Sequence, residues 1–325
     1  MPNLKQDTLA ILNYAIMAPS GYNTQPWLFQ IDHNNITIKP DLSRALPCVD
    51  PNHRELYISL GCCLENMNIA ANQLGYDLNI ISLSGGGICT KLTLATNTNN
   101  SIDFSLDLLK NRQTNRRTFN GHAINETELY QCMTQTIQDP NIHIHFWKNG
   151  TTEFEIVKKA IVQGNNKQMA NAEFIAELSY WIRYNKSHSI ETLDGLGYDA
   201  FGAPNLPRWL SKKIMSGFLN SQKQNQSDIK KIDSSSHFIL LTTQNNEVND
   251  WIQLGQKLQR FLLSLTQKGI SSTYMNQPCE EEEITEQLKQ QLNIANQYPA
   301  IILRVGYAKP MPYSKRRPVS CVLID

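Results

Sequence analysis

The sequence lacks an excess of charge of either sign: 30 Lys and Arg side chains are balanced by 29 Asp and Glu, for a formal net charge of +1. This balance gives no electrostatic reason to expect nucleic acid or an anionic membrane surface as a partner. No uninterrupted apolar run approaches the roughly 20 residues that a membrane-spanning helix needs. Residues 1–15 have no basic region followed by an apolar run, so no signal peptide is expected. We therefore predict a cytoplasmic protein with no membrane or nucleic-acid partner.

Cysteine pairs at metal-ligand or redox spacing are also missing. The chain has seven cysteines, an odd number with no C-x-x-C pair, which argues against a disulfide framework and against a zinc site. We interpret the adjacent Cys62 and Cys63 as small core residues in a reducing compartment. His143 and His145 alternate on a predicted strand, but no third ligand stands at metal-site spacing, so no metal is expected. No serine, cysteine or aspartate lies in a recognisable hydrolase signature.

What the sequence does have is the composition of a soluble globular protein with a sizeable core. Its 325 residues suggest two domains or one two-part domain, with 41% hydrophobic and 18% charged residues. Apolar spacing predicts both helices and strands, as in the α+β class. The predicted helices cover about residues 9–17, 58–75, 125–137, 153–163, 171–184 and 252–269. The predicted strands cover about residues 27–31, 78–83, 142–147, 237–243, 272–275, 301–307 and 317–324.

One long segment of the chain is repeated. Residues 58–75 can be laid over residues 252–269 with a constant offset, since 252 − 58 and 269 − 75 are both 194. The positions that are identical in the two segments are Ile58, Leu60, Gly61, Leu64, Gln73 and Gly75. Both segments keep an apolar face at helical spacing and end on a glycine suited to a C-terminal cap. Two long units favour a fused dimer over a solenoid, so we predict one half at 1–108 and a second at 109–325.

The segment 18–27, Ala-Pro-Ser-Gly-Tyr-Asn-Thr-Gln-Pro-Trp, is the most informative part of the chain. Pro19 ends the preceding helix, and the residues after it provide a tight turn before the next strand. Ser20, Asn23 and Gln25 place short polar groups at this corner, where backbone N–H groups are also free. Such a corner suits hydrogen bonding to a polar, partly aromatic ligand, and an ordinary capped turn is the alternative.

Two basic clusters stand in the second half of the chain. Residues 112–117 (Arg-Gln-Thr-Asn-Arg-Arg) hold three guanidinium groups and a hydroxyl, and residues 315–317 (Lys-Arg-Arg) form the second cluster. Arginine suits phosphate because its planar fork donates two parallel, charge-assisted hydrogen bonds. The alternative for either cluster alone is a solvated basic surface. Together with the turn at 18–27, they could surround one anionic, ring-bearing ligand. By contrast, we interpret the acidic run 280–283 as favourable charge at a helix N-terminus.

These motifs resemble those of the nitroreductase family of flavoproteins. Residues 18–27 are similar to the family's APSxxNxQPW signature, and residues 112–117 to its RRSxR-type motif. Residues 54–61 and 313–319 look especially like the Acg-type branch, in which two nitroreductase-like halves are fused in one chain. The resemblance implies a nitroreductase-like α+β fold in which two tandem halves form an intrachain pseudo-dimer. It also implies antiparallel-type central sheets flanked by helices. The cofactor that it implies is FMN.

The resemblance also implies roles for individual residues. The residues that would hold the FMN phosphate are Arg112 and Arg316, assisted by Lys315 or Arg317, with Thr114 where the family motif has Ser. The residues that would pack on the flavin or hydrogen-bond to it from the turn are Pro19, Ser20, Gly21, Asn23 and Gln25. Arg116 would approach the pyrimidine ring, where a cation stabilises reduced flavin. The strand facing flavin N5 would be Tyr274, Met275 and Asn276, and this chain departs from the Glu-Gly often found in the family there.

The distribution of the motifs predicts a single cofactor site and two alternative functions. The first half has the turn without the arginine motif, and the second has the arginine motif without the turn, so one FMN per chain is expected. The resemblance implies an oxidoreductase that passes electrons from NAD(P)H through FMN to a nitroaromatic or quinone acceptor. The alternative is a non-enzymatic protein of the Acg type that sequesters FMN under a lid. A third reading is a fold that has lost its flavin.

The segment 187–236 bears on that choice. Its glycines, prolines and polar run predict a long loop or lid with one short helix near 207–219. Its aromatic residues could cover a flavin or could pack the interface between the two halves. Because the dimer of the family would be fused within this chain, we expect a monomer.

Overall fold

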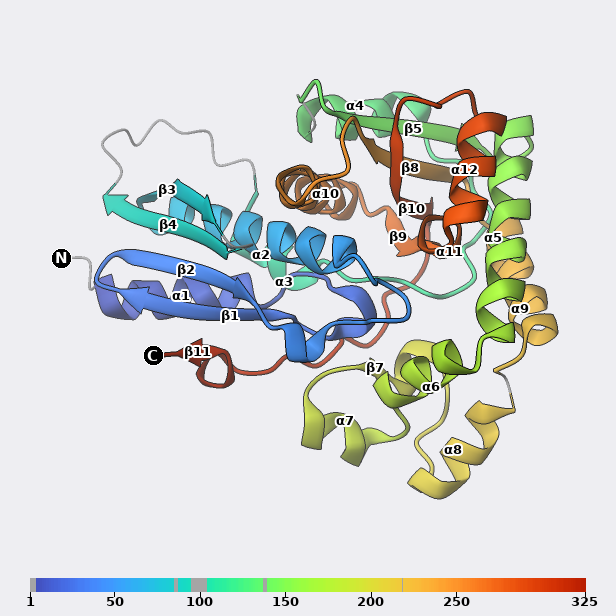
Figure 1. Cartoon of the computed structure of the whole chain (residues 1–325), viewed down its shortest axis with the longest axis horizontal. Helices are drawn as coiled ribbons and strands as arrows, with labels where there is room; N and C mark the ends of the chain where they lie inside the picture. The colour runs from blue at the N-terminus through green and yellow to red at the C-terminus, as the bar shows by residue number, and fades with distance from the viewer. Residues whose placement is uncertain (1–3, 85–86, 95–103, 137–138, 218) are drawn as a thin grey trace.

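The first half of the chain folds around an antiparallel sheet with the strand order β1-β2-β4-β3 (Figure 1). The computed structural model describes residues 4–84, 87–94, 104–136, 139–217 and 219–325. In chain order the elements of this half are α1 (Leu4–Ala15), η1 (Gly21–Asn23), β1 (Trp27–Asp32), β2 (Asn35–Pro40), η2 (Leu42–Arg44), α2 (Arg54–Gln73), β3 (Tyr76–Ser84), β4 (Gly87–Leu94) and α3 (Leu106–Asn111). In β1, Trp27 and Phe29 are buried and the residue between them is only half-buried, the period-2 pattern of a strand with one covered face.

The second half builds another antiparallel sheet, with the order β5-β8-β10-β9. Its elements are α4 (Glu126–Thr136), β5 (Ile142–Lys148), β8 (His237–Thr243), α10 (Val248–Gln267), β9 (Ser271–Tyr274), α11 (Gln277–Glu280), α12 (Glu282–Gln291) and β10 (Tyr298–Gly306). Every residue of the central strand β8 is buried, which explains its continuous run of apolar residues and threonines.

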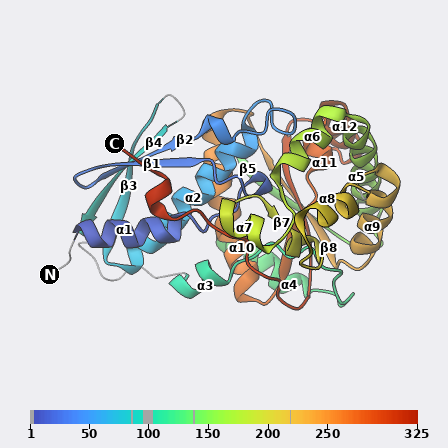
Figure 2. The same ribbon diagram turned by 90° about the horizontal axis from the view of Figure 1, so that it is seen from below.

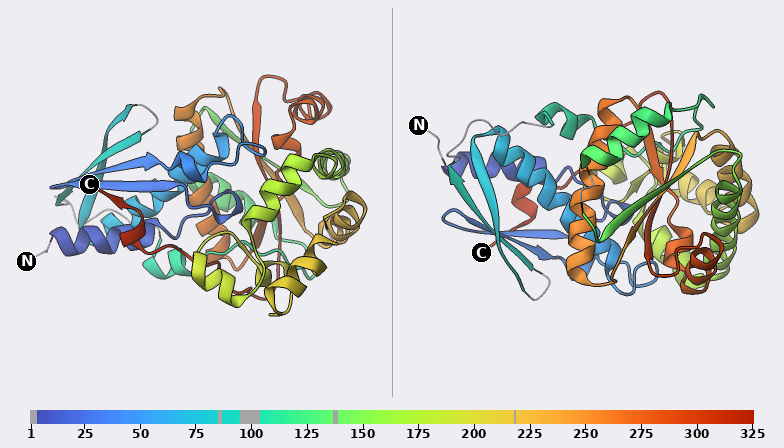
Figure 3. Two further views of the ribbon diagram at one scale, coloured as in Figure 1. Left: turned by 60° about the horizontal axis from the view of Figure 1, so that its bottom comes forward. Right: turned by 90° about the horizontal axis from the view of Figure 1, so that it is seen from above.

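The two sheets share one connectivity. If the strands of each half are numbered along the chain, both sheets have the order 1-2-4-3, and a helix of 20 residues joins the second strand to the third. These two helices, α2 and α10, pack against each other in the middle of the molecule (Figures 1 and 3). The largest apolar cluster takes residues from both helices and both sheets, so one core runs through the two halves.

A long insert separates β5 from β8, where the first half has only the short connection between β1 and β2. We call residues 149–236 the insert. It contains α5 (Thr152–Ala170), α6 (Ala172–Trp181), β6 (Ile182–Arg183), α7 (Lys186–Thr192), β7 (Leu196–Gly197), η3 (Tyr198–Phe201), α8 (Arg208–Ser216) and α9 (Ser221–Asp233). Viewed from below, α6, α7 and α8 lie together on one face of the molecule (Figure 2).

The prediction of a long loop with a single helix at 187–236 is wrong, because three helices lie between 186 and 233. The predicted helix near 207–219 corresponds to α8, and the sequence revealed neither α7 nor α9. Helix α9 begins with a polar run and buries only Asp228 and Ile232. A local cap starts it, since the side chain of Asn220 accepts a hydrogen bond from the Lys223 N–H at 2.9 Å. Because α9 buries so few residues, its apolar residues show little helical periodicity.

The C-terminal residues leave the second half and join the first sheet. After η4 (Val319–Cys321), the short strand β11 (Leu323–Ile324) pairs in parallel with β1, with Leu323 opposite Phe29. The predicted strand 317–324 is therefore confined to its last residues. The C-terminus lies beside β1 (Figure 1), so residues of the predicted second half complete the sheet of the first.

The α+β class with mainly antiparallel sheets is confirmed. All seven cysteines are free. Within the described ranges, no helix combines the length and the apolar character needed to cross a membrane. The same residues hold no group of three or more His, Cys, Asp or Glu side chains placed to bind a metal.

Candidate functional site

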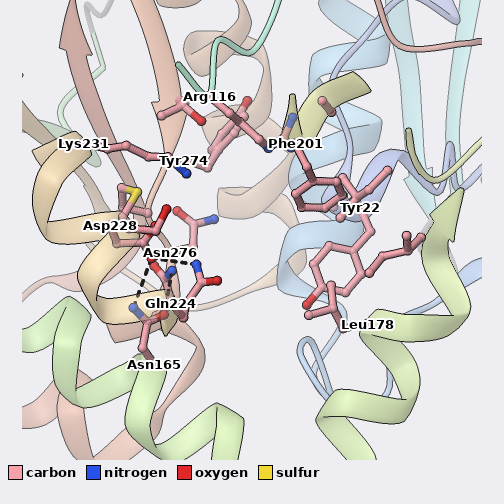
Figure 4. A pocket seen from close by; sticks show the side chains of 18 of the residues that line it. Tyr22, Arg116, Asn165, Leu178, Phe201, Gln224, Asp228, Lys231, Tyr274 and Asn276 are labelled. Atoms are coloured by element: carbon pink, nitrogen blue, oxygen red, sulfur yellow. Dashed lines mark hydrogen bonds between the residues drawn. The ribbon is translucent and has the colours of Figure 1, made fainter. Parts of the chain in front are cut away.

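A cavity of about 1000 Å³ lies between α2, β9 and the insert. This volume is at the upper end of the range that is typical of ligand pockets, roughly 300–1,000 Å³. Outside the insert, the cavity is lined by residues of the segments 19–22, 55–62, 116–118 and 273–277, and by Leu258, Glu280, Ile301, Arg304 and Met311. Figure 4 shows polar side chains on one wall of the cavity and Tyr22, Leu178 and Phe201 on the other.

The turn after α1 forms one edge of the cavity, as predicted, through Pro19, Ser20 and Gly21. The Ser20 hydroxyl accepts a hydrogen bond from the Gln25 N–H at 3.0 Å, which closes the turn. Tyr22, Asn23 and Gln25 all have positive φ values, of 46°, 57° and 56°. Non-glycine residues rarely adopt this conformation, and clusters of such residues concentrate at functional sites.

The side chains of Asn23 and Gln25 bind other segments of the chain and do not line the cavity. Asn23 Nδ2 donates to the carbonyl oxygens of Gly195 and Lys315, both at 3.1 Å. Gln25 Nε2 donates to the Leu193 carbonyl at 2.9 Å, and its Oε1 accepts from the Arg317 N–H at 2.8 Å. The two amides therefore tie the turn to the insert and to the C-terminal segment.

Arg112 is buried and Arg316 is half-buried; they come from distant parts of the chain and their charges interact, but neither lines the cavity. Arg112 is 7% exposed, and the Nε atoms of both arginines are buried without a hydrogen-bond partner. Burial lowers the pKa of both groups, and the charge of Arg112 lowers the pKa of Arg316 further. Among the described residues, no carboxylate forms an ion pair with either arginine. The side chain of Arg112 makes no hydrogen bond among the described residues, and Arg316 has its Nε without a partner. An unpaired buried donor is costly, so the two positive charges and these free donors suit an anion such as phosphate.

The rest of Arg316 is fixed against the turn. Its guanidinium donates to Asn23 Oδ1 at 2.6 Å and to the carbonyl oxygen of Ala18 at 3.2 Å. The turn of the first half and the basic cluster at 315–317 therefore meet, as the sequence predicted. The other two members of that cluster point elsewhere: Lys315 is exposed, and Arg317 donates to the Cys321 carbonyl at 2.8 Å.

The arginine motif runs beside β9. Thr114 forms a parallel bridge with Ser272, and the Asn115 N–H donates to the Ser272 carbonyl at 2.8 Å. This pairing places Arg116 on the wall of the cavity, near Tyr274. The side chain of Arg116 has no ion pair or hydrogen bond among the described residues, and burial lowers its pKa.

Tyr274, Met275 and Asn276, which the sequence analysis assigned to a strand beside the ligand, also line the cavity. The Met275 N–H donates to the Ile302 carbonyl at 2.8 Å, and Asn276 Oδ1 accepts from the Ile302 N–H at 3.0 Å. Asn276 Nδ2 donates to Glu55 Oε1 at 2.9 Å. The amide of Asn276 is thus used to position a buried carboxylate.

Sequence reasoning missed a pair of buried carboxyl groups, Glu55 of α2 and Glu280 of α11, which line the cavity together. The two are joined by a hydrogen bond, and Gln168 Nε2 donates to Glu280 Oε2 at 2.5 Å. Burial raises the pKa of both groups. The charge of Asp50 raises the pKa of Glu55 further, and the charge of Glu55 raises the pKa of Glu280 further. Two carboxylates in contact cannot both be ionised cheaply, and the pKa of Glu280 lies well above its usual range.

The insert is held over the cavity by a buried ion-pair cluster. Asp194 pairs with Arg44 of the first half and with Arg183 of the insert, whose Nη2 lies 2.6 Å from Asp194 Oδ1. The Glu177 carboxylate of α6 accepts the backbone N–H groups of Cys48 and Val49 at 2.9 and 3.1 Å. Both contacts join the insert to the first half.

The comparison with known proteins covers almost the whole chain. No family model matches it. Two curated proteins of Mycobacterium tuberculosis, named "Putative NAD(P)H nitroreductase MT3217" (strain CDC 1551 / Oshkosh) and "Putative NAD(P)H nitroreductase Rv3131" (strain ATCC 25618 / H37Rv), are each 22% identical to it over 324 residues, which is 96% of this chain and 90% of the relative. The resemblance to nitroreductases inferred from the motifs is confirmed by these two relatives.

Two solved structures also match. The FMN-dependent nitroreductase NfnB of Mycobacterium smegmatis, in complex with NADPH, is 14% identical, with 62% of this chain and 86% of that chain covered and a TM-score of 0.40. The FMN and NADPH-dependent nitroreductase NfnB of Sphigopyxis sp. strain HMH is 13% identical, with 67% and 96% covered and a TM-score of 0.45.

Proposed function

We propose that this chain is a nitroreductase-like flavoprotein, which binds FMN and uses NAD(P)H to reduce a nitroaromatic or quinone acceptor. The observation that carries the proposal is the pair Arg112 and Arg316. Each has an Nε that is buried without a hydrogen-bond partner, and Arg316 lies against the turn at residues 18–25. The similarity over 96% of the chain to the two Mycobacterium tuberculosis proteins named above supports it.

The residues present fit FMN. Arg112 and Arg316 would bind its phosphate, and the positive charge of Arg116 on the cavity wall would stabilise negative charge on a ring system beside it. Pro19, Ser20 and Gly21 form an edge of the cavity that a flat ring could pack on. When bound, FMN supplies hydride acceptance at N5 and electron transfer to the acceptor, chemistry that needs no protein nucleophile.

The carboxyl pair suits the proton demand of this reaction. Reduction of a nitro group or a quinone consumes protons as well as electrons. Burial and the charge of Glu55 raise the pKa of Glu280 well above its usual range, which favours the protonated carboxyl group, and both glutamates line the cavity. Asn276 and Gln168 hold the two carboxyl groups in place by the hydrogen bonds described above. We infer that Glu280 is a proton donor within reach of a bound acceptor.

We further infer that the chain is an internal duplication with halves at 1–108 and 109–325, related as the subunits of a dimer. The identical 1-2-4-3 strand order and the matched helices α2 and α10 support this inference. The turn of the first half meets the arginines of the second, which suits one FMN per chain. Such a chain would act as a monomer, and its seven free cysteines suit the cytoplasm.

A second candidate function is sequestration of FMN, as in the Acg-type reading. The contacts of the insert with the first half favour it, because Asp194 is shared by Arg44 and Arg183 and would hold the insert closed over the cavity. A closed insert would keep nicotinamide from the flavin while still permitting slow exchange of FMN.

The visible spectrum of protein purified without added flavin tests the proposal. We expect one FMN per chain, and rapid bleaching of its absorbance on anaerobic addition of NADH or NADPH. One FMN that stays oxidised would support sequestration and overturn the reductase. A colourless protein that takes up no added FMN would overturn both functions.

A further inference from the structure

Helix α9 presents a row of polar side chains to the cavity. Gln224, Asp228 and Lys231 follow one another at intervals of four and three residues, so they share one face of the helix. All three line the cavity, and Lys231 reaches from the helix toward its centre (Figure 4). This face was not predicted, because α9 itself was not predicted.

Positive charge predominates on this wall. Lys231 lies near Arg116 and near Arg304 of β10, and all three line the cavity. Asp228 is the carboxylate that faces them, and its Oδ2 accepts hydrogen bonds from Asn165 Nδ2 at 3.1 Å and Gln224 Nε2 at 2.8 Å. The other acidic side chains of the cavity, Asp199, Glu55 and Glu280, belong to the insert, α2 and α11.

Lys231 and Arg304 both have hydrogen-bonding capacity to spare. Among the described residues, Lys231 Nζ makes no hydrogen bond, and burial together with the charges of Arg304 and Arg116 lowers its pKa. Arg304 is 1% exposed and is held by a 2.8 Å hydrogen bond to the Arg117 carbonyl and by the Phe119 ring, 4.1 Å away. Its Nε is buried without a partner. A wall of this kind is stabilised by an added anion.

The opposite wall is apolar and aromatic. Tyr22 comes from the turn, Leu178 from α6 and Phe201 from η3, and Figure 4 shows them facing the polar wall across the cavity. A ligand that fills this part of the cavity therefore meets a flat apolar surface on one side and unpaired cations on the other.

We propose that the part of the cavity under the insert binds a second, ring-bearing ligand through an anionic group that pairs with Lys231. This inference rests on the proposed function, and it specifies the ligand that meets the flavin. The recognised group is a carboxylate or a phosphate. It belongs either to an aromatic acceptor that carries a carboxylate or to the phosphorylated nicotinamide donor.

The test measures equilibrium binding by calorimetry on the full chain, without turnover. The probes are 4-nitrobenzoate and nitrobenzene, which differ by one carboxylate. Lys231→Met removes the charge and keeps the length of the side chain. Lys230→Met is the matched control, because Lys230 is the neighbouring lysine on α9 and is exposed. We expect Lys231→Met to weaken binding of 4-nitrobenzoate by about 10- to 150-fold, as for loss of one charge-assisted hydrogen bond, and to leave nitrobenzene unchanged. Lys230→Met should match the parent with both probes.

A second arm separates the two sources of the anion. The affinities for NADPH and NADH are compared in the same way. The protein is fully reduced beforehand, so that no turnover occurs during the titration. Loss of the NADPH preference in Lys231→Met, with 4-nitrobenzoate unaffected, would assign the site to the phosphate. Lys231→Arg keeps the charge and should bind like the parent, which guards against a general effect on folding. Equal affinities of Lys231→Met and the parent for both anionic probes would overturn the proposal.

These outcomes remain separate from those of the proposed function. The FMN content of each sample is read from its absorbance before the titration. A sample that contains FMN but whose affinity for both anions is independent of Lys231 overturns this inference alone. A sample without FMN overturns the flavoprotein function, and its binding of 4-nitrobenzoate then decides the anion site by the same criterion.

Discussion

Gly61 of α2 and Gly255 of α10 lie face to face where the two long helices cross. A Cβ at position 61 would stand 2.0 Å from the carbonyl oxygen of Ile252, and one at position 255 would stand 2.1 Å from that of Ile58. The contacts are reciprocal, because 252 − 58 and 255 − 61 are both 194. Reciprocal contacts of this kind characterise a twofold interface between equivalent surfaces. They support the inference that the halves are related as the subunits of a dimer.

Replacing either glycine by alanine should push the helices apart. We expect Gly61→Ala and Gly255→Ala each to lower the free energy of unfolding by about 1–3 kcal/mol, the usual cost of overpacking a core. Urea denaturation measures it. Because one separation of the helices relieves both clashes, the double variant should lose less than the sum of the single losses. Fully additive losses would argue against a shared contact.

Removing either arginine of this pair, Arg112 or Arg316, should weaken FMN binding. Arg112→Ala and Arg316→Ala should each raise the dissociation constant by about 10- to 150-fold, because each loses a charge-assisted contact of about 1.5–3 kcal/mol. Fluorescence titration of the flavin-free protein with FMN measures it. Arg208→Ala is the control, since Arg208 is exposed. If both variants bind FMN as tightly as the parent, the phosphate assignment is wrong.

The buried proton of Glu280 predicts a dependence of stability on pH. The pKa of Glu280 is raised by burial and by the charge of Glu55, so the folded protein keeps a proton that the unfolded chain loses above about pH 4.3. The stability that this proton contributes is fully present below about pH 4.3. It is lost as the pH rises toward the pKa of Glu280 in the folded protein, at up to about 1.4 kcal/mol per pH unit.

Glu280→Gln should remove this part of the slope. Thermal or urea unfolding between pH 4.5 and 8 measures it, and the variant should gain stability relative to the parent as the pH rises. The Gln168 side chain, which donates to Glu280, can still donate to the amide oxygen. Parallel stability curves for the two proteins would contradict the assignment of a proton to Glu280.

The ion-pair cluster of the insert should control its opening. Asp194→Asn leaves Arg44 and Arg183 without their shared anion, and breaking a buried pair of this kind costs about 3–5 kcal/mol. We expect faster amide hydrogen exchange over residues 186–206. Asp199→Asn is the control, because Asp199 has no ion pair within the described residues. Exchange that is equally slow in all three proteins would show that the cluster does not hold the insert.

Local pattern predicted much of the fold, since strand β8 was placed at its observed bounds and β5 to within one residue. Contacts between residues far apart in the chain could not be predicted from local pattern. The residue types in the turn indicated polar contacts, but nothing near Asn23 shows that its amide meets the Lys315 carbonyl, 292 residues away. Helix α9 was missed because its polar residues are used to line a cavity, where no apolar period is needed.

Glu280 illustrates the same limit at the site. In the sequence it begins the acidic run 280–283, which we interpreted as charge at a helix N-terminus. In the structure, Glu282 and Glu283 do lie in the first turn of α12, whereas Glu280 ends α11 and faces the cavity. Only the packing of α2 against this corner, with Glu55, distinguishes one glutamate from its neighbours.

The parallel pairing of β11 with β1 bears on how the protein is made. Phe29 emerges from the ribosome 294 residues before Leu323, its partner in the sheet, since 323 − 29 is 294. At roughly 5–20 residues per second, the outer edge of β1 waits about 15–60 s for that partner. The strand carries Trp27, Leu28, Phe29 and Ile31, a composition prone to aggregate when its edge is open. Nascent chains of this protein should therefore depend on chaperones until residues 323–324 have emerged and paired with β1.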